Sequence, residues 1–145
     1  MKTLFLSWQF WALISAVFAA LTAIFAKIGV ENINSDFATF IRTVVILFAL
    51  VLFLSLTAQW QPWSQVSPRS LLFLVLSGLA TGASWLCYFR ALKIGDAARV
   101  APVDKLSVAF VVLFAVIFLG ERLSGFSALG VALIIAGAVL VVLKP

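Results

Sequence analysis

The sequence predicts an all-α membrane protein with five transmembrane helices. Of its 145 residues, 65% are hydrophobic, the mean hydropathy is +1.24, and only ten basic and five acidic side chains are present. A soluble domain is about half apolar and about a quarter charged. Five apolar stretches are each long enough to cross a bilayer, which takes about 20 residues. We expect a single five-helix domain over residues 1–145, with helices at about 8–30, 37–57, 71–92, 97–119 and 125–143.

The composition argues against several classes of function. The basic residues are scattered among apolar runs and form no contiguous basic face, so we expect no nucleic-acid partner. The chain has no histidine and one cysteine, Cys87, so we expect no metal site and no cofactor. Little acid–base machinery is left inside the apolar stretches, and we expect no enzymatic activity.

The first two helices are joined by a short polar turn, residues 31–36, in which Ser35 or Asp36 is placed to cap the second helix. The second helix contains one charge, Arg42, about 9 Å from the helix start at 1.5 Å per residue. Two alternatives are open for Arg42. Its side chain either extends back to the lipid headgroups, or it faces the bundle interior and binds an anion or a carboxylate.

The third helix follows a surface loop at residues 58–70 and carries two features. Gly78 and Gly82 form a Gly-xxx-Gly face on which another helix can pack closely. Trp85 and Tyr88 are three residues apart on one side, close to Arg90. These two rings either face lipid or line the path of a solute.

The fourth helix carries a proline, Pro102, and an adjacent carboxylate and amine, Asp104 and Lys105, in its first third. A charge at the centre of a span costs roughly 2.5 to 3.5 kcal/mol, so these groups require neighbouring helices or a wet cavity. Pro102 removes a backbone donor, which either kinks the helix or opens it locally. The chain then turns at Gly120 and restarts at Ser124. The last helix has a stripe of small residues for helix packing, Ala128, Ala132 and Ala136.

Five spans bring several charges to the same side of the membrane. The cluster is expected to contain four cations and one carboxylate, namely Lys27, Arg42, Arg90, Lys105 and Asp104. One interpretation is a half-buried basic vestibule that favours an anionic or zwitterionic solute, with Arg42 as the partner of Asp104 by depth. The other is that these residues follow the positive-inside bias and mark a cytoplasmic face.

The topology signal is weak. Five basic residues on one side (Lys27, Arg90, Lys93, Arg99 and Lys144) oppose three on the other (Lys2, Arg69 and Arg122). We therefore predict dual topology. Because the number of spans is odd, two copies fused in tandem would be inverted relative to one another, and a single copy reaches the same geometry as an antiparallel homodimer.

The segment Ala91–Val142 resembles the carboxy-terminal part of an EamA domain of the drug/metabolite transporter superfamily. The matching features are the Gly95 turn, Pro102, the Gly120–Glu121 pair and the helix around Gly130 and Gly137. Arg42 also falls where such domains often carry an arginine. The sequence PVDKLS suggests the small five-span bacterial and archaeal branch of this superfamily.

This resemblance implies a multi-pass inner-membrane protein that exports or exchanges small metabolites. We expect a secondary transporter subunit with Asp104, Lys105 and Arg42 at or near the substrate or coupling site. The alternative is a non-transporting scaffold or accessory subunit that uses its small-residue faces as an interface. The first span has no acidic residue before Glu31, unlike the related four-span multidrug exporters, which argues against proton-coupled export of hydrophobic cations.

Overall fold

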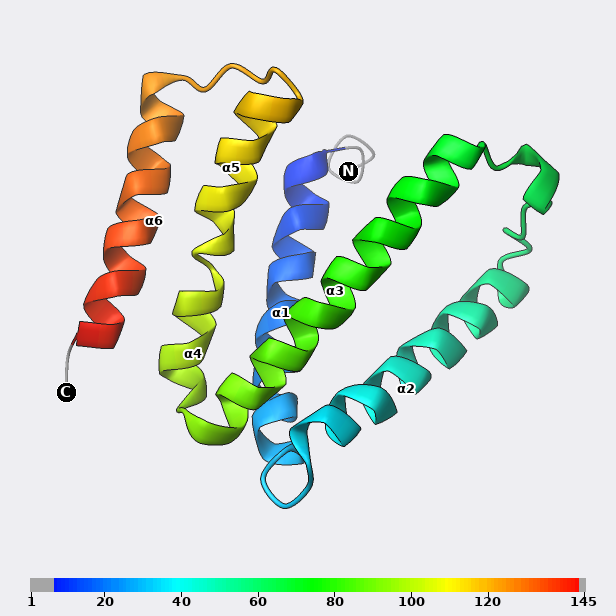
Figure 1. The fold of residues 1–145 in the computed structure, drawn as a ribbon, viewed down its shortest axis with the longest axis horizontal. Coiled ribbons are helices and arrows are strands. Elements are labelled where there is room, and N and C mark those ends of the chain that lie inside the picture. Colours follow the sequence, from blue (N-terminus) through cyan, green and yellow to red (C-terminus); the bar gives the residue numbers. More distant parts are fainter. Residues whose placement is uncertain (1–6, 144–145) are drawn as a thin grey trace. The chain divides into compact units, whose positions relative to one another are not determined.

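The computed structural model describes residues 7–143, so Lys2 and Lys144 of the charge count lie outside it. In this range the chain forms six α-helices and one 3₁₀ turn (Figure 1): α1 (Trp8–Gly29), α2 (Ser35–Leu56), η1 (Trp63–Gln65), α3 (Pro68–Ile94), α4 (Ala97–Asp104), α5 (Ser107–Phe118) and α6 (Gly125–Leu143). Five stretches are long and apolar enough to cross a membrane, with α4 and α5 together making the fourth. The predicted five-span, all-helical architecture is confirmed.

Two helices begin earlier than predicted because residues upstream cap them. The Asn34 side chain accepts hydrogen bonds from the backbone N–H groups of Asp36 (2.8 Å) and Phe37 (3.1 Å), so α2 begins at Ser35. The prediction that Ser35 or Asp36 caps this helix is therefore wrong. The α3 helix begins at Pro68, since proline suits a first helical turn and the Ser67 hydroxyl accepts a hydrogen bond from the Ser70 N–H.

The turn before the last span forms as predicted. Gly120 has a φ of +67°, a conformation that glycine adopts without steric cost, and it ends α5 together with Leu119. The Ser124 hydroxyl then accepts a hydrogen bond from the Ser127 N–H at 3.1 Å, which satisfies one of the free donors at the start of α6.

The fourth span is interrupted at Lys105 and Leu106, where the ribbon narrows between α4 and α5 (Figure 1). Pro102 lies inside α4 and has no N–H to donate to the preceding turn. Past it, Leu106 N–H donates to the Val103 carbonyl and Val108 N–H to the Lys105 carbonyl, three residues back instead of four. The helix is interrupted here by a tighter turn, and the choice between a kink and a local opening at Pro102 stays a prediction.

The chain divides into two compact units, which we describe separately. The hairpin unit is continuous (Ile24–Ile94), and the split unit combines Met1–Ala23 with Gly95–Pro145. In the hairpin unit, α2 and α3 pack side by side in opposite directions (Figure 1). In the split unit, α6 packs against α4 and α5. A single domain over residues 1–145 stays a prediction.

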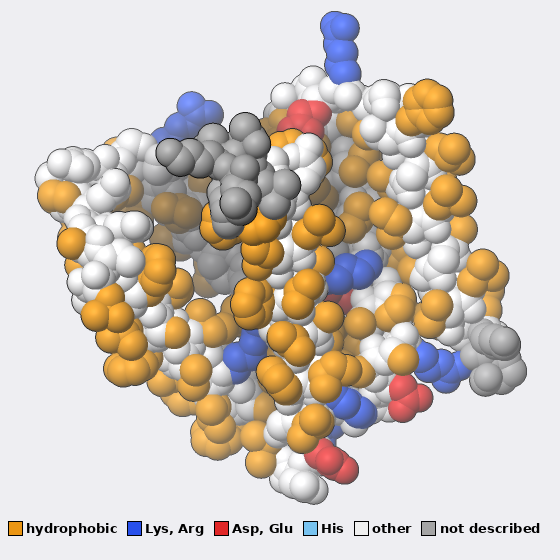
Figure 2. All heavy atoms as spheres, turned by 180° about the vertical axis from the view of Figure 1, so that it is seen from behind, with side chains coloured by type: hydrophobic (Ala, Val, Ile, Leu, Met, Phe, Trp, Pro, Cys, Tyr) orange, Lys and Arg blue, Asp and Glu red, His pale blue; other side chains and the backbone are white. Residues whose placement is uncertain are grey.

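The core of the hairpin unit lies where α1 ends, α2 begins and α3 ends. Its buried residues come from these three helix ends: Ala26, Val30, Ala38, Thr39, Phe89 and Leu92. Elsewhere hydrophobic side chains cover the visible lengths of the helices (Figure 2), as expected for surfaces that face lipid. The hairpin unit is thus held together mainly at one end.

Candidate functional site

The candidate site in the hairpin unit is formed by Arg42 of α2 and two aromatic rings of α3. The guanidinium carbon of Arg42 lies 3.9 Å from the centroid of the Trp85 ring and 5.6 Å from that of Phe89. Trp85 and Phe89 are four residues apart and so lie on one face of α3, and Phe89 is buried in the core. The core therefore fixes the ring platform on which the guanidinium is stacked.

The position of the guanidinium argues against one of the two alternatives for Arg42, a side chain that extends to the headgroups, while binding of an anion or a carboxylate stays a prediction. Arg42 is seven residues after the start of α2 and Trp85 nine residues before the end of α3, which places both roughly 10 to 13 Å along their helices from the hairpin's packed end. A side chain that reached for the headgroups would extend toward Ser35 and Ile94. The stacking on Trp85 holds it level with the interior of the span instead.

The edge of the Arg42 guanidinium is unused within its own unit. A guanidinium presents five N–H donors in one plane, and the stacked ring covers only a face of that plane. Among the described residues of the hairpin unit, no carboxylate or carbonyl accepts a hydrogen bond from Arg42. The pairing of Arg42 with Asp104, which belongs to the split unit, stays a prediction.

The ring platform continues along α3 as the two glycines of the Gly-xxx-Gly motif. Gly78, Gly82, Trp85 and Phe89 follow one another at spacings of four, three and four residues, which places them on the same helix face. A Cβ atom at either glycine would meet no atom of the hairpin unit within 4 Å. Beside the Arg42–Trp85 pair, the unit therefore leaves room along α3.

Arg90 is bound to Asp36 and is not free to bind a solute. Arg90 Nε donates to Asp36 Oδ1 at 2.9 Å and Nη2 donates to Oδ2 at 2.7 Å, a bidentate pair between the end of α3 and the start of α2. From the sequence, Arg90 was predicted to be a cation of the vestibule and Asp36 only a possible helix cap. Asp36 therefore removes one positive charge from the predicted cluster.

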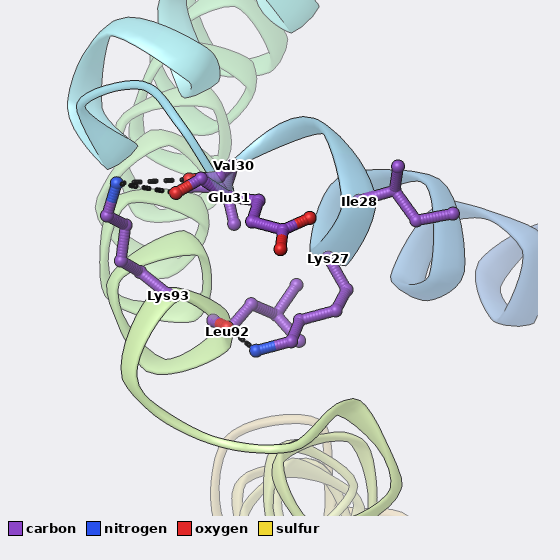
Figure 3. Close-up of a pocket in the computed structure, with 6 residues that line it drawn as sticks. All are labelled: Lys27, Ile28, Val30, Glu31, Leu92 and Lys93. Atoms are coloured by element: carbon purple, nitrogen blue, oxygen red, sulfur yellow. Dashed lines mark hydrogen bonds between the residues drawn. The ribbon is translucent and has the colours of Figure 1, made fainter.

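Two lysines join the end of α1 to the end of α3 in a reciprocal clasp, which we define as Lys27 and Lys93 with their carbonyl partners (Figure 3). Lys27 Nζ donates to the Leu92 carbonyl at 2.8 Å. Lys93 Nζ donates to the carbonyls of Val30 (3.1 Å), Glu31 (3.4 Å) and Ile33. Each ammonium group thus donates hydrogen bonds to carbonyls at or just past the C-terminal end of the other helix, where the helix dipole favours a cation.

The clasp borders a pocket of about 190 Å³ that is lined by Lys27, Ile28, Val30, Glu31, Leu92 and Lys93 (Figure 3). Lys93 uses its three N–H donors on backbone carbonyls, and Lys27 donates to one. The pocket is therefore better explained as the seam of the clasp than as a solute site. Neither Lys93 nor Glu31 was among the predicted site residues, although a lysine in the last turn of both α1 and α3 was a visible signal.

In the split unit, Asp104 lies at the end of α4 and its Oδ2 accepts a hydrogen bond from Lys105 Nζ at 3.3 Å. Both side chains are partly exposed, at 36% for Asp104 and 56% for Lys105. The neighbouring ammonium compensates the charge of the carboxylate at the interruption of the span. The sequence shows that these residues follow Pro102 closely. The structure shows in addition that they lie where α4 ends.

The remaining predicted residues have these places. Tyr88 is half-buried on α3, three residues after Trp85. On α6, Ala128, Ala132 and Ala136 are all exposed, while the more covered face carries Val131, Ile135 and Ala138. Packing through the alanine stripe, like packing through the two glycines, stays a prediction.

Comparison with known proteins decides the family. A model of the EamA-like transporter family matches residues 6–143. The chain belongs to this family. A protein of a Sinorhizobium species, named "Uncharacterized transporter in cobO 3'region", is 66% identical over 134 residues that cover 92% of this chain and 95% of that protein. No solved structure matches the chain.

A more distant relative differs in length. The protein named "Uncharacterized transporter YxxF" of Bacillus subtilis (strain 168) is 25% identical over 135 residues, which cover 92% of this chain but 42% of that protein. The resemblance seen in the sequence rested mainly on residues 91–142, whereas the family match extends over nearly the whole chain. Family membership and the five spans identify a multi-pass membrane protein with a transporter role.

Proposed function

We propose that this EamA-like protein is a secondary transporter subunit of the inner (plasma) membrane that moves a small anionic or zwitterionic metabolite. The observation that carries the proposal is the Arg42 guanidinium, which is stacked on Trp85 inside a span and whose edge meets no acceptor in its unit. An ionisable group at that depth is costly, and such groups in membrane proteins mark substrate and ion pathways.

The proposed functional form is an antiparallel homodimer, or a pair with an inverted paralogue. Five spans place the two termini on opposite sides of the membrane, so two oppositely inserted copies make an inverted repeat. The Bacillus subtilis relative supports this reading, because the matched segment is 42% of its length and leaves room for a second copy. The exposed alanine face of α6 is a candidate contact between the copies.

Coupling is assigned to the break in the fourth span. The broken helices of transporters form ion sites, and the presence of Asp104 and Lys105 at this break supports the same role here. Any proton coupling through a carboxylate within the spans should then run through Asp104. Transport by Asp104→Asn that keeps its pH dependence would exclude this role.

The test of transport compares metabolites inside and outside cells that lack or overproduce the protein. We expect one solute to change reciprocally between the two strains, which gives both solute and direction. Purified protein in liposomes should then move that solute. The competing function is a non-transporting scaffold, which the exposed small-residue faces also allow. A protein that moves no solute but copurifies with one stoichiometric partner is the scaffold and not a transporter.

Reporter fusions at Pro145 test the antiparallel arrangement. Dual topology predicts that reporters active on either side of the membrane both give signal. A single orientation, in cells without a paralogue of the opposite orientation, would contradict the homodimer.

A further inference from the structure

We infer that Arg42 binds the carboxylate of a monocarboxylate solute, whose remaining atoms lie along the Gly82–Gly78 face of α3. The inference rests on the proposed transport function and specifies its substrate class. It goes beyond a general preference for anions because three properties of the site, its planarity, its charge and its open side, each restrict the ligand.

The first property is the planar edge of the guanidinium. The guanidinium carbon lies over the Trp85 ring, and the planar fork of N–H donors of a guanidinium matches the two oxygens of a carboxylate. The contact with the Trp85 ring holds the guanidinium carbon at this position. A ligand with two oxygens in one plane fits this edge better than one that offers a single acceptor.

The second property is the single charge. Around the packed end of the hairpin unit, Arg90 is neutralised by Asp36, and the ammonium groups of Lys27 and Lys93 are directed to backbone carbonyls. Arg42 therefore offers one positive charge inside the span. A carboxylate cancels it, whereas a phosphate dianion would leave an uncompensated charge in a medium of low dielectric constant, which is costly.

The third property is the open side along α3. Gly82 precedes Trp85 by three residues on the same helix face, and a Cβ built at either Gly82 or Gly78 has no neighbour in the unit within 4 Å. Glycine leaves the helix backbone accessible there, so the body of a small solute can lie against it while its carboxylate meets Arg42. On this reading the glycines serve the solute path and not helix packing.

A lipid headgroup is the other source of an oxyanion for this site. The Arg42–Trp85 contact lies roughly 10 Å along α2 from its first residue, within the apolar stretch of the span. A headgroup carries the same oxyanion chemistry, and an experiment on the purified protein distinguishes the two sources.

The experiment measures arginine modification by phenylglyoxal on the full-length protein in nanodiscs of zwitterionic lipid, with peptide mass spectrometry reporting each arginine. The probe is a mixture of acetate, lactate and pyruvate, and the matched control is the same acids as primary amides. At a probe concentration of about ten times Kd, modification of Arg42 should slow about tenfold by mass action. Modification of Arg69, an exposed residue at the start of α3, should not change.

Other outcomes of this experiment would contradict the inference. Protection by the amides as well, or by inorganic phosphate alone, would overturn the carboxylate assignment. If Arg42 is protected from modification in nanodiscs that contain phosphatidylglycerol, without any added acid, then Arg42 binds lipid headgroups and not a solute. Absence of protection in every arm would also overturn the inference. None of these measurements needs transport, so a bound carboxylate without transport would contradict the proposed function and leave the inference standing.

Variants supply a second readout. In a protein that keeps Trp85 as its single tryptophan, carboxylates should change the fluorescence, and Arg42→Lys, which keeps the charge but loses the fork, should weaken this binding about tenfold. Gly82→Leu should abolish binding by filling the open side. Gly130→Leu on α6 makes the same exchange at a glycine with equally open surroundings and should leave binding unchanged. Equal binding by Gly82→Leu and Gly130→Leu would remove the glycine face from the site.

Discussion

The guanidinium of Arg42 lies 3.9 Å from the ring of Trp85, a contact between α2 and α3 inside the span. It joins two residues that are 43 positions apart in the sequence, and it places the only charge in the interior of α2 on an aromatic surface. Cation–π stacking partly offsets the cost of holding this charge in the membrane.

Replacing Trp85 by leucine removes the ring and keeps an apolar side chain. We expect the free energy of unfolding to fall by about 0.5 to 2 kcal/mol. This is the range of cation–π energies from exposed to desolvated sites. Thermal unfolding in nanodiscs measures the loss. Trp63→Leu is the matched control, because Trp63 is 81% exposed in the α2–α3 connection. Equal losses of stability for the two substitutions would show that the Arg42–Trp85 contact does not stabilise the protein.

Removing the Arg90–Asp36 pair should lower the melting temperature and separate the end of α3 from the start of α2. Asp36→Asn and Arg90→Gln each break the bidentate contact, and the swap Asp36→Arg with Arg90→Asp restores it in reverse. A double-mutant cycle on melting temperature should show recovery in the swap. Because both side chains are exposed, the effect should shrink as salt is raised. Additive losses without recovery would contradict direct coupling.

Lys93→Met should cost more stability than any other lysine exchange in the hairpin unit, because it strips three carbonyls of their donor. An unsatisfied buried polar group costs about 1 to 3 kcal/mol, and water at the membrane face will reduce this for the exposed carbonyls. Hydrogen exchange should accelerate at residues 30–33. Arg122→Met removes a positive charge from the connection before α6 and is the control. If Lys93→Met leaves hydrogen exchange at the α1–α2 turn unchanged, the clasp does not stabilise this turn.

Pro102→Ala gives the fourth span back a backbone donor and relieves the clash of the proline ring with the preceding turn. We expect a more stable protein, since proline in a helix interior costs about 3 kcal/mol relative to alanine. Hydrogen exchange at residues 105–109 should slow, and transport should fall if opening of this span is a step of the cycle. An equally active variant with slowed exchange would separate the break from transport.

The fold was predictable from the sequence because a membrane span is a property of composition and length. The α2 boundary was not, since Ser35, Asp36 and Asn34 are all good caps and only the backbone path decides between them. Pro102 signalled a disturbed helix, but the break itself appears three residues later, where the hydrogen-bond pattern changes.

The candidate site was predictable only in part. Arg42 and Trp85 were recognised separately, as a charge in one span and a ring in another, and nothing in the sequence fixes which faces of two helices meet. Charge counting treated Arg90 as a free cation because its partner Asp36 is 54 positions away. Lys93 was counted only for topology, because hydrogen bonds to carbonyls leave no complementary residue to find.

The clasp also bears on how the chain is made. The hairpin unit is continuous, so all of it is synthesised before the split unit is complete, and domains generally fold as units during synthesis. Its closing contact depends on Lys93, which lies next to the last residue of α3. Until that residue leaves the ribosome, the carbonyls that follow α1 have no ammonium partner. The last turn of α1 can therefore be joined to α3 through the clasp only after nearly the whole hairpin unit has been synthesised.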